Sequence, residues 1–116
     1  MSKRLNVNLK PPSSLSVAYE INALYWNEHH QRAGIAAALG VCWSGQKRPA
    51  RATNPLLGVA VYGHAVIDDL LARGWAYQEI MEVGTEAIKL VIDALPHEQR
   101  VEELEGNSEG QGDSTS

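Results

Sequence analysis

The sequence contains no phenylalanine, a single cysteine and no apolar run of membrane-spanning length. Without phenylalanine, the core must be built from aliphatic side chains, three tryptophans and four tyrosines. The single cysteine, Cys42, excludes a disulfide within the chain. The apolar stretch 34–41 is far too short to cross a bilayer, and the N-terminal residues lack the apolar segment of a secretory signal. These absences predict a soluble protein of a reducing cytoplasm that makes no membrane contact.

Charge is balanced over most of the chain and strongly acidic only at its end. Residues 1–95 carry nine Lys and Arg against eight Asp and Glu, whereas residues 96–116 carry one Arg against six acids. The terminal segment is otherwise rich in glycine and serine and holds little apolar material, so it buries too little surface to fold. We expect a disordered acidic tail at 97–116. With 116 residues in all, the rest of the chain is one small domain.

From about Ser16, residues of one helical face recur in steps of three and four, which predicts a helix. The residues on this face are Val17, Ile21, Leu24, Tyr25, Glu28, Arg32, Ile35 and Leu39. Gly34 interrupts the pattern, at a cost of about 1 kcal/mol relative to alanine in a helix. Two interpretations stay open: one continuous helix over 16–40, or two helices that meet near 32–34.

Two further helices are predicted on either side of Gly74. Asn54 and Pro55 are typical of a helix start, with an N-cap followed by proline at the first helical position. Gly74 is typical of a helix end, because glycine adopts the left-handed backbone conformation that closes helices. The last helix is expected over 77–95, where proline follows and cannot continue it.

The fold class that follows is all-α. We expect a small helical domain over 14–96, in which the last two helices form an antiparallel pair. Before it, Leu5, Val7 and Leu9 alternate with polar residues, which is also compatible with an edge strand, but we assign residues 1–13 as a flexible arm. A core of this size buries little apolar area, so we expect self-association into a homo-oligomer or a protein partner.

No residue pattern indicates a catalytic, cofactor or metal site. His29 and His30 are adjacent, so their side chains leave a helix about 100° apart and are badly placed to share a metal ion. Cys42 and His64 would together make a thiolate–imidazole pair, but no spacing brings them together. Next to Trp43 at a helix end, Cys42 is more typical of a small buried apolar residue. We therefore expect no enzyme activity, no cofactor and no metal.

Two charged groups are candidates for binding a partner. The segment 42–53 is long for a loop and combines a tryptophan with three basic residues and no acid. On the last helix, three acids share a stripe that faces away from the apolar side and suits a basic partner. The candidate partner-binding residues are Trp43, Lys47, Arg48 and Arg51 in the loop and Glu79, Glu82 and Glu86 on the helix. Ordinary solvation is the alternative interpretation for both groups.

The spacing L-x-x-x-G-x-x-x-x-E-I over 70–80 resembles that of the helix-turn-helix family of DNA-binding proteins. The resemblance implies that the helix after the turn enters the major groove. The corresponding stretch offers Thr85, Glu86 and a single Lys89, whereas neutralising phosphates needs several cations. A nucleic-acid-binding regulator is therefore kept as the alternative function.

Three stretches precede the acidic tail: ALYW, RAGIAAALGVCWSGQKRP and VYGHAVIDDLLARGWAYQEIMEVGTEAIKLVIDALP. In this order they resemble small phage and prophage accessory proteins encoded among tail genes, some of which serve as tail assembly chaperones. The resemblance covers about residues 20–105. It implies a non-enzymatic, protein-binding role in phage-type particle assembly, with a phage structural protein as partner. The location it implies is the cytoplasm of the bacterial host or the phage particle.

Overall fold

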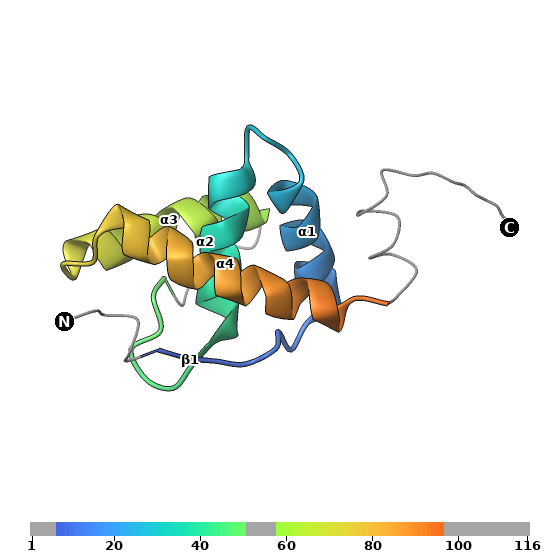
Figure 1. Cartoon of the computed structure of the whole chain (residues 1–116), viewed down its shortest axis with the longest axis horizontal. Helices are drawn as coiled ribbons and strands as arrows, with labels where there is room; N and C mark the ends of the chain where they lie inside the picture. Colours follow the sequence, from blue (N-terminus) through green and yellow to red (C-terminus); the bar gives the residue numbers. More distant parts are fainter. Residues whose placement is uncertain (1–6, 51–57, 97–116) are drawn as a thin grey trace, which may run out of the picture.

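The structure is a computed structural model in which residues 7–50 and 58–96 are described. These segments form helices α1 (Leu15–Tyr25), α2 (Gln31–Cys42), α3 (Gly58–Ala72) and α4 (Tyr77–Ala94), with strands β1 (Asn8–Leu9) and β2 (Trp43–Ser44). The predicted all-α class is confirmed. Figure 1 shows α3 and α4 running in opposite directions with α2 between them, while α1 packs at one side.

Helix α1 starts at a serine cap and stops at an asparagine turn. The Ser14 side chain accepts a hydrogen bond from the backbone N–H of Val17 at 3.3 Å, which pairs one of the first-turn N–H groups. After α1 the chain turns through residues 26–30 before α2 begins. In this turn the side-chain oxygen of Asn27 accepts from the backbone N–H of His29 at 2.9 Å. Such a local bond competes with continued helix, and α1 ends there.

The break between α1 and α2 corrects the sequence prediction in this region. No single helical face runs over 16–40, and the two helices meet at 26–30 rather than near 32–34. Gly34 instead lies buried inside α2. A Cβ atom at this position would lie 2.9 Å from the backbone nitrogen of Tyr25. Glycine therefore allows α2 to approach the end of α1 and does not end a helix.

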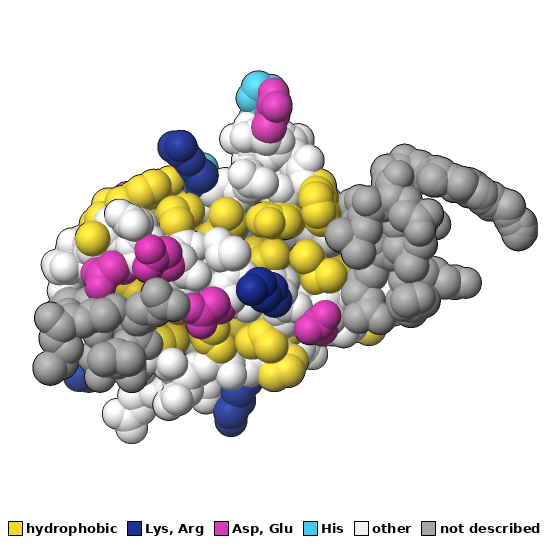
Figure 2. All heavy atoms as spheres, viewed as in Figure 1, with side chains coloured by type: hydrophobic (Ala, Val, Ile, Leu, Met, Phe, Trp, Pro, Cys, Tyr) yellow, Lys and Arg dark blue, Asp and Glu magenta, His cyan; other side chains and the backbone are white. Residues whose placement is uncertain are grey.

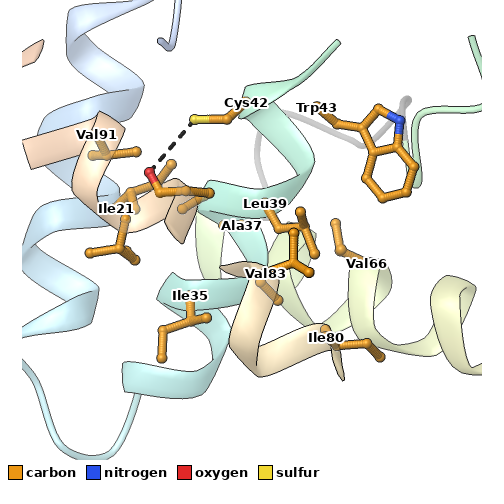
Figure 3. Packing of buried hydrophobic residues seen from close by; sticks show 14 of the residues in the cluster. Ile21, Ile35, Ala37, Leu39, Cys42, Trp43, Val66, Ile80, Val83 and Val91 are labelled. Atoms are coloured by element: carbon orange, nitrogen blue, oxygen red, sulfur yellow. Dashed lines mark hydrogen bonds between the residues drawn. The ribbon is translucent and has the colours of Figure 1, made fainter. Parts of the chain in front are cut away.

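Helix α2 is the centre of the core. Every residue from Ala33 to Gly40 is buried, and Figure 3 shows side chains of all four helices meeting around it. Small side chains allow close helix crossings, since a Cβ atom on Gly63 of α3 would collide with the carbonyl oxygen of Ala33. The largest fully buried aliphatic side chains are Ile21, Leu39, Val66, Leu70, Ile80, Val83, Ile88 and Val91.

A tight turn at Gly74 joins α3 to α4, as the sequence predicts. Gly74 has a φ angle of +96°, which is the left-handed conformation that glycine adopts without strain. The N–H of Trp75 donates to the carbonyl of Leu70 at 3.0 Å and closes the end of α3. Helix α4 then opens with the Glu79 side chain accepting from the N–H of Ala76 at 3.0 Å. Both ends of α4 lie within one residue of the predicted positions.

The two short strands pair the N-terminal segment with the residues at the end of α2. They pair antiparallel with Leu9 opposite Trp43, and the N–H of Lys10 donates to the carbonyl of Cys42 at 2.8 Å. The alternating pattern near the N-terminus thus forms a strand at residues 8 and 9.

Three predictions about the course of the chain concern residues outside the two described segments. They are the helix start at Asn54 and Pro55, the first six residues of the assigned arm and the acidic tail at 97–116. Among the helices that the structure does describe, none combines the length and the apolar character needed to traverse a membrane.

Candidate interaction surfaces

The loop after β2, which carries the predicted basic cluster, is tied to the end of α3. Arg73 and Asp69 form a bidentate ion pair in which both N–O distances are 3.0 Å. Each also binds the loop backbone: Arg73 donates to the carbonyl of Lys47 at 2.6 Å, and Asp69 accepts from the N–H of Ala50 at 2.8 Å. Lys47 and Ala50 have φ angles of +69° and +44°. These hydrogen bonds hold the two residues in a conformation that side chains disfavour.

The side chain of Arg48 caps the C-terminal end of α2. One guanidinium nitrogen donates to the carbonyls of Gly40 and Val41 at 2.9 and 3.3 Å. The last carbonyls of a helix have no partner within it, and the helix dipole favours a cation at that end. Arg48 also lowers the pKa of the neighbouring Tyr62 phenol, but desolvation by burial has the larger effect and raises this pKa above its usual value.

The remaining loop candidates differ in exposure. Trp43 is only 8% exposed and packs against Trp75 with ring centroids 5.6 Å apart, so it offers little surface to a partner. Lys47 is exposed, and Arg51 lies outside the described residues. The structure therefore places Trp43 in the core and leaves Lys47 as a cation accessible to a partner.

The three acidic candidates lie together on α4. Glu82 and Glu86 are exposed, whereas Glu79 is half-buried at the start of the helix, where it caps the N–H of Ala76. The Gln78 side chain donates to Glu82 at 3.2 Å. Figure 2 shows acidic side chains along α4 on the face in view, with hydrophobic side chains between and beside them. The structure therefore leaves Glu82 and Glu86 exposed on one side of α4 and places Glu79 in a capping contact.

The packing of α3 and α4 bears on the helix-turn-helix alternative. Both helices pack mainly on α2, and they contact each other little beyond the turn. The exposed side of α4, which corresponds to the DNA-reading helix, carries Glu82 and Glu86 together with Lys89. Negative charge on that side repels phosphates and opposes DNA binding.

Cys42 has the environment of a core residue. It is buried, with its Sγ atom 3.8 Å from the carbonyl oxygen of Ala87 (Figure 3). Burial raises its pKa from 9.0 to about 11, so the thiol stays protonated at neutral pH and is a poor nucleophile. His29, His30 and His64 are exposed. Within residues 7–50 and 58–96, no three His, Cys, Asp or Glu residues cluster closely enough to hold a metal ion.

Helix α1 exposes an apolar stripe that the sequence analysis missed. Leu15, Tyr19 and Trp26 are 52%, 38% and 44% exposed, and their steps of four and seven place them on one side of the helix. Ala18 and Ile21 on the neighbouring side are buried. The spacing is visible in the sequence, but it runs beside the longer pattern that begins with Val17 and Ile21 and faces the core.

The exposed Trp26 ring is held in a fixed orientation. Its Nε1–H donates to the side-chain oxygen of Asn22 at 3.0 Å. Asn22 is itself buried, so losing this bond would leave a buried acceptor unpaired. Tyr25 packs edge-on against the indole, with ring centroids 5.1 Å apart. The α1 stripe therefore carries a preorganised aromatic side chain.

Helix α3 also exposes two apolar residues on its outer side. Gly63, Val66 and Leu70 are buried, whereas Val61 and Leu71 are 42% and 43% exposed. The outer side of a peripheral helix is ordinarily polar, because only one stripe faces the core. More than two fifths of each of these two apolar side chains therefore stays exposed in the described chain.

Comparison of the chain with protein-family models, curated proteins and solved structures gives no match. Function is therefore inferred from the surfaces of the molecule: the acidic stripe of α4, the anchored basic loop and the apolar stripes of α1 and α3.

Proposed function

We propose that the protein functions by binding another protein, with the apolar stripe of α1 as the contact surface. One observation carries this proposal: Trp26 is held in a fixed orientation on an exposed apolar helix side. Tryptophan and tyrosine are the side chains that most often dominate the energy of protein interfaces. Because Trp26 is already immobilised, association avoids an ordering cost of about 0.5–1.5 kcal/mol for this side chain.

The size of the stripe suits a specific contact of moderate strength. Leu15, Tyr19 and Trp26 are all large, and fully burying one such side chain contributes about 1.5–3 kcal/mol. Much of this gain is offset by the translational and rotational freedom lost on association. The stripe alone therefore supports reversible binding, and the acidic stripe of α4 would favour a partner with a basic surface.

The proposed partner is a structural protein of a phage-type particle, and the proposed role is in assembly of the tail. The support is the resemblance of the chain to phage and prophage accessory proteins, together with a surface built for protein contact. The rival function is a nucleic-acid-binding regulator, favoured by the helix-turn-helix spacing over 70–80. The acidic residues on the exposed side of α4 count against this rival.

Capture experiments with the full chain test the proposal. Tagged wild-type protein, the double variant Leu15→Ser with Tyr19→Ser, and the control Glu20→Ser are each incubated with lysate of cells producing the particle. We expect wild type and control to retain a particle protein, and the double variant to retain at least about tenfold less. Glu20 is exposed on α1 outside the stripe, so the control separates the stripe from the helix as a whole.

Circular dichroism of the three proteins verifies that α1 stays folded in each. Equal retention by all three would remove the α1 stripe as the contact surface. Retention of nucleic acid that falls steeply as salt is raised, with no particle protein, would instead support the regulator.

A further inference from the structure

The outer side of α3 carries four exposed residues in a regular order. Val61, His64, Asp68 and Leu71 are all exposed and follow one another in steps of three, four and three. This is the spacing of residues that line the seam between two packed helices. The seam lies opposite the side of α3 that packs on α2, where Val66 is buried.

The order of these residues is symmetric about position 66. Apolar Val61 and Leu71 lie five residues to either side, and His64 and Asp68 lie two residues to either side. A second copy of the helix, antiparallel and related by a twofold axis at this level, would place each residue opposite its counterpart. Val61 then meets Leu71 of the second copy, and His64 meets Asp68 of the second copy, so that every contact occurs twice.

We propose that the protein forms a twofold-symmetric dimer through the outer side of α3, with a second copy of this chain as the occupant. Charge complementarity carries the proposal. In the antiparallel pair each imidazole faces a carboxylate, and an imidazole N–H donates to a carboxylate whether or not the ring is protonated. In a parallel pair, Asp68 would face Asp68 of the second copy. The charges therefore favour the antiparallel arrangement and disfavour the parallel one.

The residues beside the seam permit close approach. They are Ala60, Ala65, Ile67 and Ala72. None is charged, and three are alanines, so two α3 helices can pack at the usual distance of about 8–10 Å between axes. Leu71 and Val61 would close the two ends of the contact with apolar surface.

The expected affinity follows from the length of the contact. Helix α3 has 15 residues, and a helix of this length extends about 22 Å. An interface formed by one such helix from each copy belongs to the small end of specific interfaces. We therefore expect a dissociation constant in the micromolar range.

Sedimentation equilibrium of the full chain tests the dimer over about 5 to about 500 µM, a range that brackets micromolar association. Wild type should pass from monomer to dimer across this range. Val61→Glu and Asp68→Lys should each weaken the dimer at least about tenfold, by placing a charge against a leucine and a cation against a histidine. Glu20→Lys, the same kind of charge reversal on exposed α1, should leave dimerisation unchanged.

Replacing both polar residues of the seam by an oppositely charged pair tests the relative orientation of the two α3 helices. Adding His64→Glu to Asp68→Lys puts a carboxylate opposite each lysine again if the helices are antiparallel. The double variant should then recover affinity to within about threefold of wild type. In a parallel pair it would oppose like charges and recover nothing.

Each result decides one part of the proposal, provided that circular dichroism shows unchanged helicity. A wild type that stays monomeric throughout overturns it. A dimer that is indifferent to Val61→Glu and Asp68→Lys lies on another surface and also overturns it. A dimer that both single variants weaken and the double variant does not rescue overturns the antiparallel arrangement. None of these results depends on the partner proposed for α1.

Discussion

Helices α2 and α3 are both largely apolar, yet they are covered to very different extents. Helix α2 contacts the other three helices, and its residues from Ala33 to Gly40 are all buried. Helix α3 packs on α2 along one side and leaves Val61 and Leu71 exposed on the other. An apolar composition therefore has a structural explanation along α2 and only on one side of α3.

The difference separates the apolar residues that serve folding from those that stay available for the association proposed above. Replacing a buried residue of α2 removes contacts that the fold depends on. Valine and leucine on the outer side of α3 gain less from the packing of a single copy, since more than two fifths of each side chain remains exposed to water. Helix α4 illustrates the ordinary case, because its outer side carries Glu82 and Glu86.

The variant with the largest expected effect on stability tests whether the fold depends on the close contact between α3 and α2. Gly63→Leu would push a side chain against the backbone carbonyl of Ala33, which no rotation of a side chain relieves. We expect the free energy of unfolding to fall by about 4 kcal/mol or more. Ala72→Leu, at the exposed end of the same helix, should change it by less than about 0.5 kcal/mol. Urea denaturation measures the free energy of unfolding of both variants. A stable Gly63→Leu protein would contradict the close contact between α3 and α2 at this position.

A matched pair of leucines compares the buried helix with the exposed side directly. Leu39→Ala on α2 should cost about 3 kcal/mol, because it leaves a cavity in the core. Leu71→Ala on α3 should cost less than about 0.5 kcal/mol when unfolding is followed at a protein concentration low enough to dissociate the proposed dimer. Similar losses for the two variants would mean that the outer side of α3 is covered within one copy.

The reactivity of Cys42 tests burial at the end of α2. Its pKa is raised from 9.0 to about 11, so at pH 8 the native protein holds about 100-fold less thiolate than the unfolded chain. Alkylation by iodoacetamide should be slower by at least this factor in the native protein. The unfolded chain loses its thiol proton first, so this group makes the fold less stable as the pH rises from 9.0 to about 11. Equal alkylation rates with and without denaturant would show that Cys42 is accessible.

The smallest effect concerns the turn that links α3 to α4. Gly74→Val should cost about 1–2 kcal/mol, because a β-branched residue is strained at a positive φ angle. Ala72→Ser, two residues earlier and exposed, should cost less than about 0.5 kcal/mol. Thermal unfolding of the two variants provides the comparison. Equal losses would show that the left-handed conformation of Gly74 is not what the turn requires.

The parts of the fold that were predictable depend on local interactions. The turn at Gly74 and both ends of α4 follow from glycine conformation, proline and helical spacing. The end of α1 was predicted at the wrong place, because the chain leaves the helix at the Asn27 turn, whereas Gly34 lies inside α2. Asparagine turns are local as well, so the sequence carries a signal for a helix end at Asn27 and a competing signal at Gly34.

The candidate surfaces were less predictable, because exposure depends on distant residues. Trp43 and Arg48 belong to one basic loop in the sequence, yet the first packs on Trp75 and the second closes α2. Nothing near Arg73 in the chain indicates that it binds the backbone of Lys47. Each of these contacts joins segments that only the packing of helices brings together.

The amino-acid sequence by itself determined that the chain is helical and how α3 ends, since caps, turns and helical spacing act within a few residues. Only the tertiary structure decided which apolar side of α1 is buried, that α2 is the central helix, and that α3 has an uncovered outer side. The physical reason is that the hydrophobic effect depends on the area removed from water. That area is a property of two elements in contact, and a single helix does not specify it.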